Sequence, residues 1–211
     1  MAVIDSFKTN TTSVAYTWPV DVSGIERIML SAHGDLQRLL SAFFARTITI
    51  NPIYAHNSPR TQLASPEHPV TQRREVHLQC SRKMVCVATS TVTITSPLCE
   101  RLFLDEKFAI GQMFRRIGKV PEFALLACGS EELEDGKRKL WRRYTLSMEG
   151  FETDITEVFP DRDMFVRCEA WLDGSDAEKE KAGVEECPAD EAKQRYAQAQ
   201  ASDATPLPAS A

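Results

Sequence analysis

Two charged residues interrupt the apolar faces of two predicted β-strands, and this pattern constrains the fold more than any other feature of the chain. Side chains alternate over residues 71–80 and again over residues 153–159, which places Arg74 and Glu157 on the inward, apolar faces. The apolar residues that share these faces are Val76, Leu78 and Cys80 in the first segment and Ile155 and Phe159 in the second. An ionised side chain that is buried without a partner costs several kcal/mol. Arg74 and Glu157 therefore either neutralise each other or face a cavity that holds a polar ligand.

The composition is that of one ordinary domain with polar ends. The chain has 211 residues, of which 43% are apolar, and this is enough for one hydrophobic core. No segment approaches the roughly 18 consecutive apolar residues of a membrane span, and residues 1–12 lack the apolar block of a secretory signal. The six cysteines form no C-x-x-C pair, which is typical of reduced thiols. We expect a soluble, cytoplasmic protein without a membrane partner.

Several functional classes lose support from the absence of their motifs. The four histidines form no ligand pair at helical or zinc-finger spacing, so we expect no metal site. The chain has no G-x-S-x-G motif, no P-loop and no glycine-rich dinucleotide motif, which argues against serine hydrolases, NTPases and NAD-dependent dehydrogenases.

The charge distribution argues against a nucleic-acid partner. The nine acidic and four basic residues from Asp173 onward account for the whole net charge of −5, so the rest of the chain is neutral. A neutral body lacks the basic face that a phosphate backbone requires. One basic cluster is predicted to lie in a loop and on a solvated strand edge, and it consists of Lys137, Arg138, Lys139, Arg142 and Arg143.

The order of the predicted elements indicates an α+β fold, with an antiparallel sheet and helices packed on one face. We predict an irregular arm over residues 1–22, one domain over residues 23–172, and an acidic, largely disordered tail over residues 173–211. Within the domain we predict two helices that meet at Gly34 and Asp35, a strand over residues 47–54, a loop over 57–69, a hairpin of strands 71–80 and 84–95, a loop with a short helix over 96–116, a strand over 121–128, a surface loop over 129–139, and a second hairpin of strands 141–148 and 151–159.

The candidate site combines a cation with an acid. The planar guanidinium of Arg74 matches a carboxylate, and Glu157 could accept a hydrogen bond from a substrate hydroxyl or remove a proton. Gly111, next to Ile110, would let a backbone N–H approach a ligand oxygen, although close packing would also explain a glycine there. Asp35 has the position of a helix N-cap, and the alternative is an anion site at that helix start.

Three segments of the chain, in order over about residues 25–165, resemble the chorismate lyase family. Residues 73–76 (RREV), with the apolar strand 85–92 after them, resemble the family's first hairpin. Residues 108–114 (FAIGQMF) resemble its segment around a Leu-Gly pair. Residues 140–143 (LWRR) and 156–160 (TEVFP) resemble its closing block.

The resemblance implies an antiparallel sheet with helices on one side, which enclose a ligand cavity covered by mobile flaps. It also implies conversion of chorismate to 4-hydroxybenzoate and pyruvate without a cofactor. The family's ligand arginine corresponds to Arg74, its acidic residue to Glu157, and its backbone contact with a carboxylate to Ile110 and Gly111. The chain departs from the family at Asp35, because an acid there would repel a carboxylate ligand.

The sequence thus predicts a carbon–oxygen lyase that acts on a small cyclic or aromatic carboxylic acid, with Arg74 and Glu157 as catalytic residues. Ile110, Gly111 and Asp35 are predicted to bind the substrate. A family member repurposed as a dehydratase, isomerase or lyase in secondary metabolism is one alternative, and a non-catalytic module that binds small acids is another. The sequence leaves the oligomeric state open.

Overall fold

The computed structural model describes residues 4–8 and 10–174 of the chain, and the unit that carries the fold ends at Asp173. Its elements are β1 (Ile4–Lys8), β2 (Thr11–Ala15), α1 (Gly24–Leu30), α2 (Leu36–Phe44), β3 (Ile48–Asn57), β4 (Val70–Cys80), β5 (Lys83–Ile94), α3 (Pro97–Glu100), the π-helix η1 (Arg101–Asp105), α4 (Ile110–Ile117), β6 (Glu122–Glu132), β7 (Arg138–Met148), β8 (Phe151–Phe159) and α5 (Asp163–Asp173).

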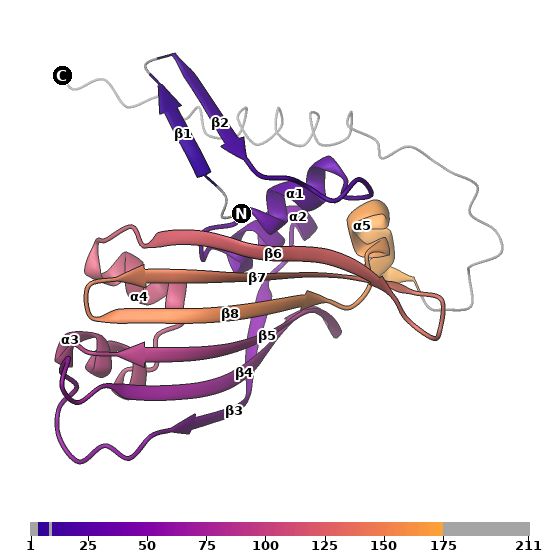
Figure 1. The fold of residues 1–211 in the computed structure, drawn as a ribbon. Coiled ribbons are helices and arrows are strands. Elements are labelled where there is room, and N and C mark those ends of the chain that lie inside the picture. Colours follow the sequence, from indigo (N-terminus) through magenta and orange to yellow (C-terminus); the bar gives the residue numbers. More distant parts are fainter. Residues whose placement is uncertain (1–3, 9, 175–211) are drawn as a thin grey trace, which may run out of the picture. The chain divides into compact units, whose positions relative to one another are not determined.

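Six of the strands form one antiparallel sheet in the order β3-β4-β5-β8-β7-β6 (Figure 1). The alternation of the sequence matches the pairing, because Arg74 lies opposite Ser90 and Ala88 lies opposite Glu157, so all four residues project from the same face. This inward face packs against the helices and forms the core. The predicted α+β architecture, an antiparallel sheet with helices on one side, is therefore confirmed.

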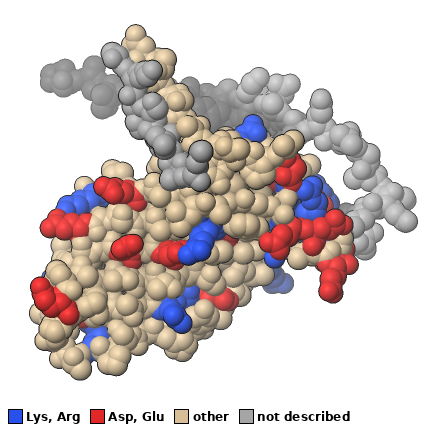
Figure 2. Space-filling model, viewed as in Figure 1, with Lys and Arg blue, Asp and Glu red and all other residues tan. Residues whose placement is uncertain are grey.

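The opposite face of the sheet carries no helix among the described residues. Figure 2 shows this face, where acidic and basic side chains are scattered among other residues.

No helix in the described part of the chain has the length and apolarity that a bilayer span needs.

The junction between α1 and α2 follows the sequence signals closely. Ser23 caps α1, since its hydroxyl accepts a hydrogen bond from the Glu26 backbone N–H and the Glu26 carboxylate accepts one from the Ser23 N–H. Gly34 separates the two helices with a φ of 82°, a conformation that favours glycine.

Two predictions about the elements are wrong, and one helix was not predicted. Part of the arm over residues 1–22 is regular, because β1 and β2 pair as an antiparallel hairpin. The predicted loop over residues 129–139 is shorter, because β6 continues to Glu132 and β7 begins at Arg138. Helix α5 was not predicted. The predicted tail over residues 173–211 lies outside the described residues, except for its first two.

Arg162, which follows β8, links to α1 and to the segment before it. Its guanidinium donates to both carboxylate oxygens of Glu26, at 2.6 and 2.8 Å, and to Asp21 at 2.7 Å. Burial alone would raise the pKa of Glu26, but the hydrogen bonds from Arg162 and Ser23 outweigh burial and lower this pKa below its ordinary value of 4.5. The charged pair therefore stabilises the fold above that pH.

The Glu26→Gln variant tests this anchor. A carboxyl group whose pKa is lower in the folded state contributes stability that is present above its unfolded pKa and lost as the pH falls through the folded value. We expect the variant to lose about 3 kcal/mol in the free energy of unfolding at pH 7, and to differ less from the wild type below pH 4.5. Urea denaturation at several pH values measures the difference, and a gap that stays constant with pH would contradict the assignment.

Candidate functional site

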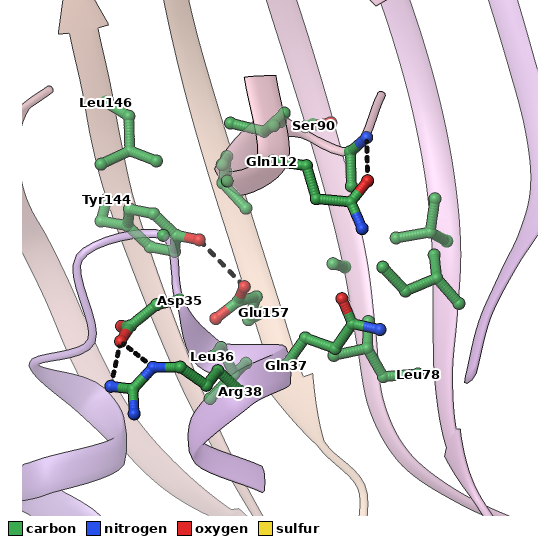
Figure 3. A pocket seen from close by; sticks show the side chains of 18 of the residues that line it. Asp35, Leu36, Gln37, Arg38, Leu78, Ser90, Gln112, Tyr144, Leu146 and Glu157 are labelled. Atoms are coloured by element: carbon green, nitrogen blue, oxygen red, sulfur yellow. Dashed lines mark hydrogen bonds and ion pairs between the residues drawn. The ribbon is translucent and has the colours of Figure 1, made fainter. Parts of the chain in front are cut away.

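A cavity of about 160 Å³ lies between the inward face of the sheet and the first turns of α2 and α4 (Figure 3). Its walls come from β3, β4, β5, β7 and β8, and apolar side chains such as Val76, Leu78 and Ile155 line much of it. All five predicted site residues line this cavity, and these are Asp35, Arg74, Ile110, Gly111 and Glu157. Segments more than 120 residues apart in the sequence therefore meet at one hollow.

Arg74 enters the cavity without an acidic partner. Its Nε lies 3.4 Å from the hydroxyl oxygen of Ser90, and its guanidinium carbon lies 4.8 Å from the ring centre of Phe103. No Asp or Glu among the described residues forms an ion pair with it, so the alternative in which Arg74 and Glu157 neutralise each other is wrong. Burial lowers the pKa of Arg74 to about 10, and the group stays charged at neutral pH.

Glu157 is paired with two residues of the neighbouring strand β7. Its Oε2 accepts a hydrogen bond from the Nε of Arg142 at 2.7 Å. Its Oε1 accepts one from the hydroxyl of Tyr144 at 2.9 Å (Figure 3). Burial, followed by the adjacent Glu157 carboxylate, raises the pKa of Tyr144 well above its ordinary value. The phenol therefore keeps its proton and donates a hydrogen bond to Glu157.

The prediction that Arg142 belongs to a solvated basic cluster is wrong. Arg142 is 0% exposed, and Tyr144 is 2% exposed. The signal was present in the sequence, because β7 alternates and places these two residues on the inward face with Leu140 and Leu146. Both functional partners of Glu157 could have been found from this pattern.

The mouth of the cavity carries a second ion pair. Asp35 occupies the N-cap position of α2, as predicted, but its side chain makes no capping hydrogen bond. It binds Arg38 instead, with 2.6 Å between the Asp35 Oδ2 and the Arg38 Nη2 (Figure 3). This pairing compensates the negative charge of Asp35 at the cavity mouth. Arg115, on α4, also lines the cavity and has no ion-pair partner among the described residues.

Two glycines bring the helix starts together at this mouth. A Cβ on Gly111 would lie 2.3 Å from the carbonyl oxygen of Gly34, which is far inside van der Waals contact. Close packing is therefore one reason for a glycine at position 111, and it is one of the two explanations that the sequence suggested. The same contact brings the backbone N–H groups at the start of α4 to the cavity wall.

Gly111→Ala should separate the start of α4 from the α1–α2 junction. We expect a loss of about 1–3 kcal/mol in the free energy of unfolding, because the backbone must shift to admit the methyl group. The control is Gly24→Ala on α1, where the nearest atom would lie 3.8 Å from the new Cβ. We expect this control to gain up to about 1 kcal/mol. Equal effects of the two substitutions in chemical denaturation would refute the role of the contact.

Metal-binding groups and disulfides were also sought among the described residues. No group of three or more metal-binding side chains occurs among them. No two of the described cysteines form a disulfide with each other. Comparison of the chain with protein-family models and with curated proteins finds no match.

The polar groups of the cavity face each other across an apolar space. Glu157 lies two strands from Arg74 and two residues along the sheet, level with Val76. Strand geometry puts their backbones about 10 Å apart across the sheet and about 7 Å apart along it. The side chains thus extend from separate places toward one hollow, with a cation at one end and a hydrogen-bond acceptor at the other. This arrangement suits a small acid that also carries a hydrogen-bond donor.

Proposed function

We propose that the cavity binds a monocyclic carboxylic acid and that the protein is a cofactor-independent lyase of the chorismate lyase type. Such an enzyme converts chorismate to 4-hydroxybenzoate and pyruvate. The observation that carries the proposal is Arg74, a cation that lines the cavity without an acidic partner among the described residues. An anionic ligand would supply the missing charge, and the planar guanidinium fork matches a carboxylate.

The size of the cavity supports a ligand with one ring. An apolar cavity of about 150 Å³ is known to hold a benzene ring, and the cavity here has about 160 Å³. The ring of 4-hydroxybenzoate would fill it. The enolpyruvyl arm of chorismate would extend toward the mouth, where Arg38 and Arg115 lie.

The polar groups have suitable positions for an elimination. In the proposed reaction the bond between the ring and the ether oxygen breaks, and the neighbouring ring carbon, which carries the hydroxyl, loses its proton. The electron pair of that C–H bond completes the aromatic ring, and the departing enolpyruvate takes up a proton to become pyruvate. Arg74 would hold a carboxylate or the ether oxygen, and Glu157 would bind the ring hydroxyl or assist removal of the proton. No step requires a cofactor.

One observation favours a second candidate, a relative that acts on another cyclic acid as a dehydratase, isomerase or lyase. Asp35 departs from the family's pattern, and its ion pair with Arg38 neutralises one of the arginines at the mouth. A substrate with a different or uncharged arm would suit such a mouth. A protein that only binds small acids would share the cavity and lack turnover.

Incubation with chorismate tests the proposal, with 4-hydroxybenzoate and pyruvate as the measured products. We expect equal amounts of both from the wild type and a loss of at least about 100-fold in rate in Glu157→Gln. The control is Glu152→Gln, which removes an exposed carboxylate from the same strand, and it should keep full activity. Binding of 4-hydroxybenzoate without turnover would favour the binding module, and an active Glu157→Gln variant would reject the assigned site.

Replacement of Arg74 by methionine should separate stability from binding. Removal of an unpaired charge from a partly buried position relieves a desolvation cost, so we expect Arg74→Met to unfold at a higher temperature than the wild type without ligand. The same variant should lose the thermal shift that 4-hydroxybenzoate gives the wild type. The control is Arg73→Ala, which changes the exposed neighbour on the opposite face. A ligand shift that survives in Arg74→Met would disprove the role of Arg74.

A further inference from the structure

Arg142 is outside the cavity wall, yet it connects two parts of the cavity. Its Nε donates to Glu157, and its Nη1 donates to the backbone carbonyls of Leu30 and Ala32, each at 2.8 Å. Its guanidinium carbon lies 4.2 Å from the ring centre of Tyr144, the other partner of Glu157. Three of the contacts of this one buried cation are therefore to oxygens.

Leu30 is the last residue of α1, and Ala32 lies two residues later, directly before the cavity mouth. Carbonyl groups at the C-terminus of a helix lack helical partners and carry partial negative charge, so they favour a cation. Gly34 and Asp35, which line the mouth, follow only two and three residues after Ala32. Arg142 thus fixes the approach to the mouth and the carboxylate on the wall at the same time.

Several charged or titratable groups surround Glu157, but only one is its ion-pair partner among the described residues. Arg142 and Tyr144 contact it from β7, and Cys86 on β5 is close enough to interact electrostatically. Across the cavity lie Arg74 from β4, the Asp35–Arg38 pair from α2 and Arg115 from α4. A buried carboxylate that loses its only counterion takes up a proton instead of remaining charged.

We infer that Arg142 is a positioning residue that keeps Glu157 an ionised hydrogen-bond acceptor, and that it thereby gives the cavity its preference for a ligand with a hydroxyl group. The preference rests on the proposed function, whereas the charge of Glu157 does not. An ionised carboxylate only accepts hydrogen bonds, whereas a protonated one also donates. Loss of Arg142 would therefore change which ligands match the wall.

Infrared spectroscopy of the ligand-free protein tests the charge of Glu157. We expect Arg142→Met to show the carbonyl band of a protonated carboxylic acid near neutral pH, and we expect the band to vanish in the double variant Arg142→Met with Glu157→Gln. Arg142→Lys, which keeps a positive charge there, should restore the wild-type spectrum. Absence of the band in a folded Arg142→Met protein would overturn the inference. If that variant does not fold, Arg142→Gln replaces it in the same measurement, and absence of the band there would overturn the inference.

Ligand preference supplies the second readout, with benzoate and 4-hydroxybenzoate as probes in titration calorimetry. A hydrogen bond to a charged acceptor corresponds to a preference of about tenfold or more for the hydroxylated acid. We expect the wild type to show this preference and Arg142→Met to lose most of it.

The matched control is Arg162→Met, which breaks another buried arginine–glutamate pair, away from the cavity. It should lower stability and leave the preference unchanged. An unchanged preference in Arg142→Met, or an equal loss in Arg162→Met, would overturn the inference. If the wild type binds neither acid, the proposed function fails, and the infrared result still decides the charge of Glu157.

Discussion

Arg74 is a cation that the sheet carries on its inward face with no acid beside it, and the arrangement of the site follows from this constraint. A hydroxyl contact from Ser90 and the ring of Phe103 compensate only part of the cost of taking a guanidinium out of water. The rest of this desolvation free energy must be offset by the stability of the fold as a whole. Strained or unpaired groups of this kind persist where the surrounding structure holds them, and they occur often at functional sites.

Comparison of three partly or fully buried arginines shows that Arg74 is the exception in lacking an acidic partner among the described residues. Arg162 binds Glu26 and Asp21 and joins two distant segments of the chain. Arg142 binds Glu157 and the end of α1. Both guanidinium groups donate to an acid and to backbone carbonyls, although the Nη2 of Arg142 has no hydrogen-bond partner among the described residues. Arg74 has no acidic partner among these residues. The fold thus supplies acidic partners to Arg142 and Arg162 but none to Arg74 among the described residues, and this contrast supports the proposal that a ligand is the counterion of Arg74.

The sequence predicted much of the sheet and the two central residues, because alternation in a strand fixes which side chains face inward. It also placed the helix boundary at Gly34 and the mouth residues Ile110 and Gly111. It did not predict that Glu157 pairs with Arg142, since that pairing depends on β7 lying beside β8 and on the end of α1 lying beneath them. Arg142 was assigned to a solvated cluster by its basic neighbours, although its alternation with Leu140 and Tyr144 indicated burial. The role of Asp35 also required the fold, because Arg38 is one helical turn away and competes with the capping geometry.

Under the proposed function, the groups of the cavity would divide the work that an elimination on a cyclic acid requires. A cation and helix-start N–H groups would face one part of the ligand, and a carboxylate and a phenol would face another. A crystal structure of the protein with 4-hydroxybenzoate bound tests this account most directly. We expect an oxygen of the ligand within hydrogen-bonding distance of the Arg74 guanidinium and the ring against Val76 and Ile155. A ligand bound elsewhere on the protein, with Arg74 still lacking an anion, would contradict the account.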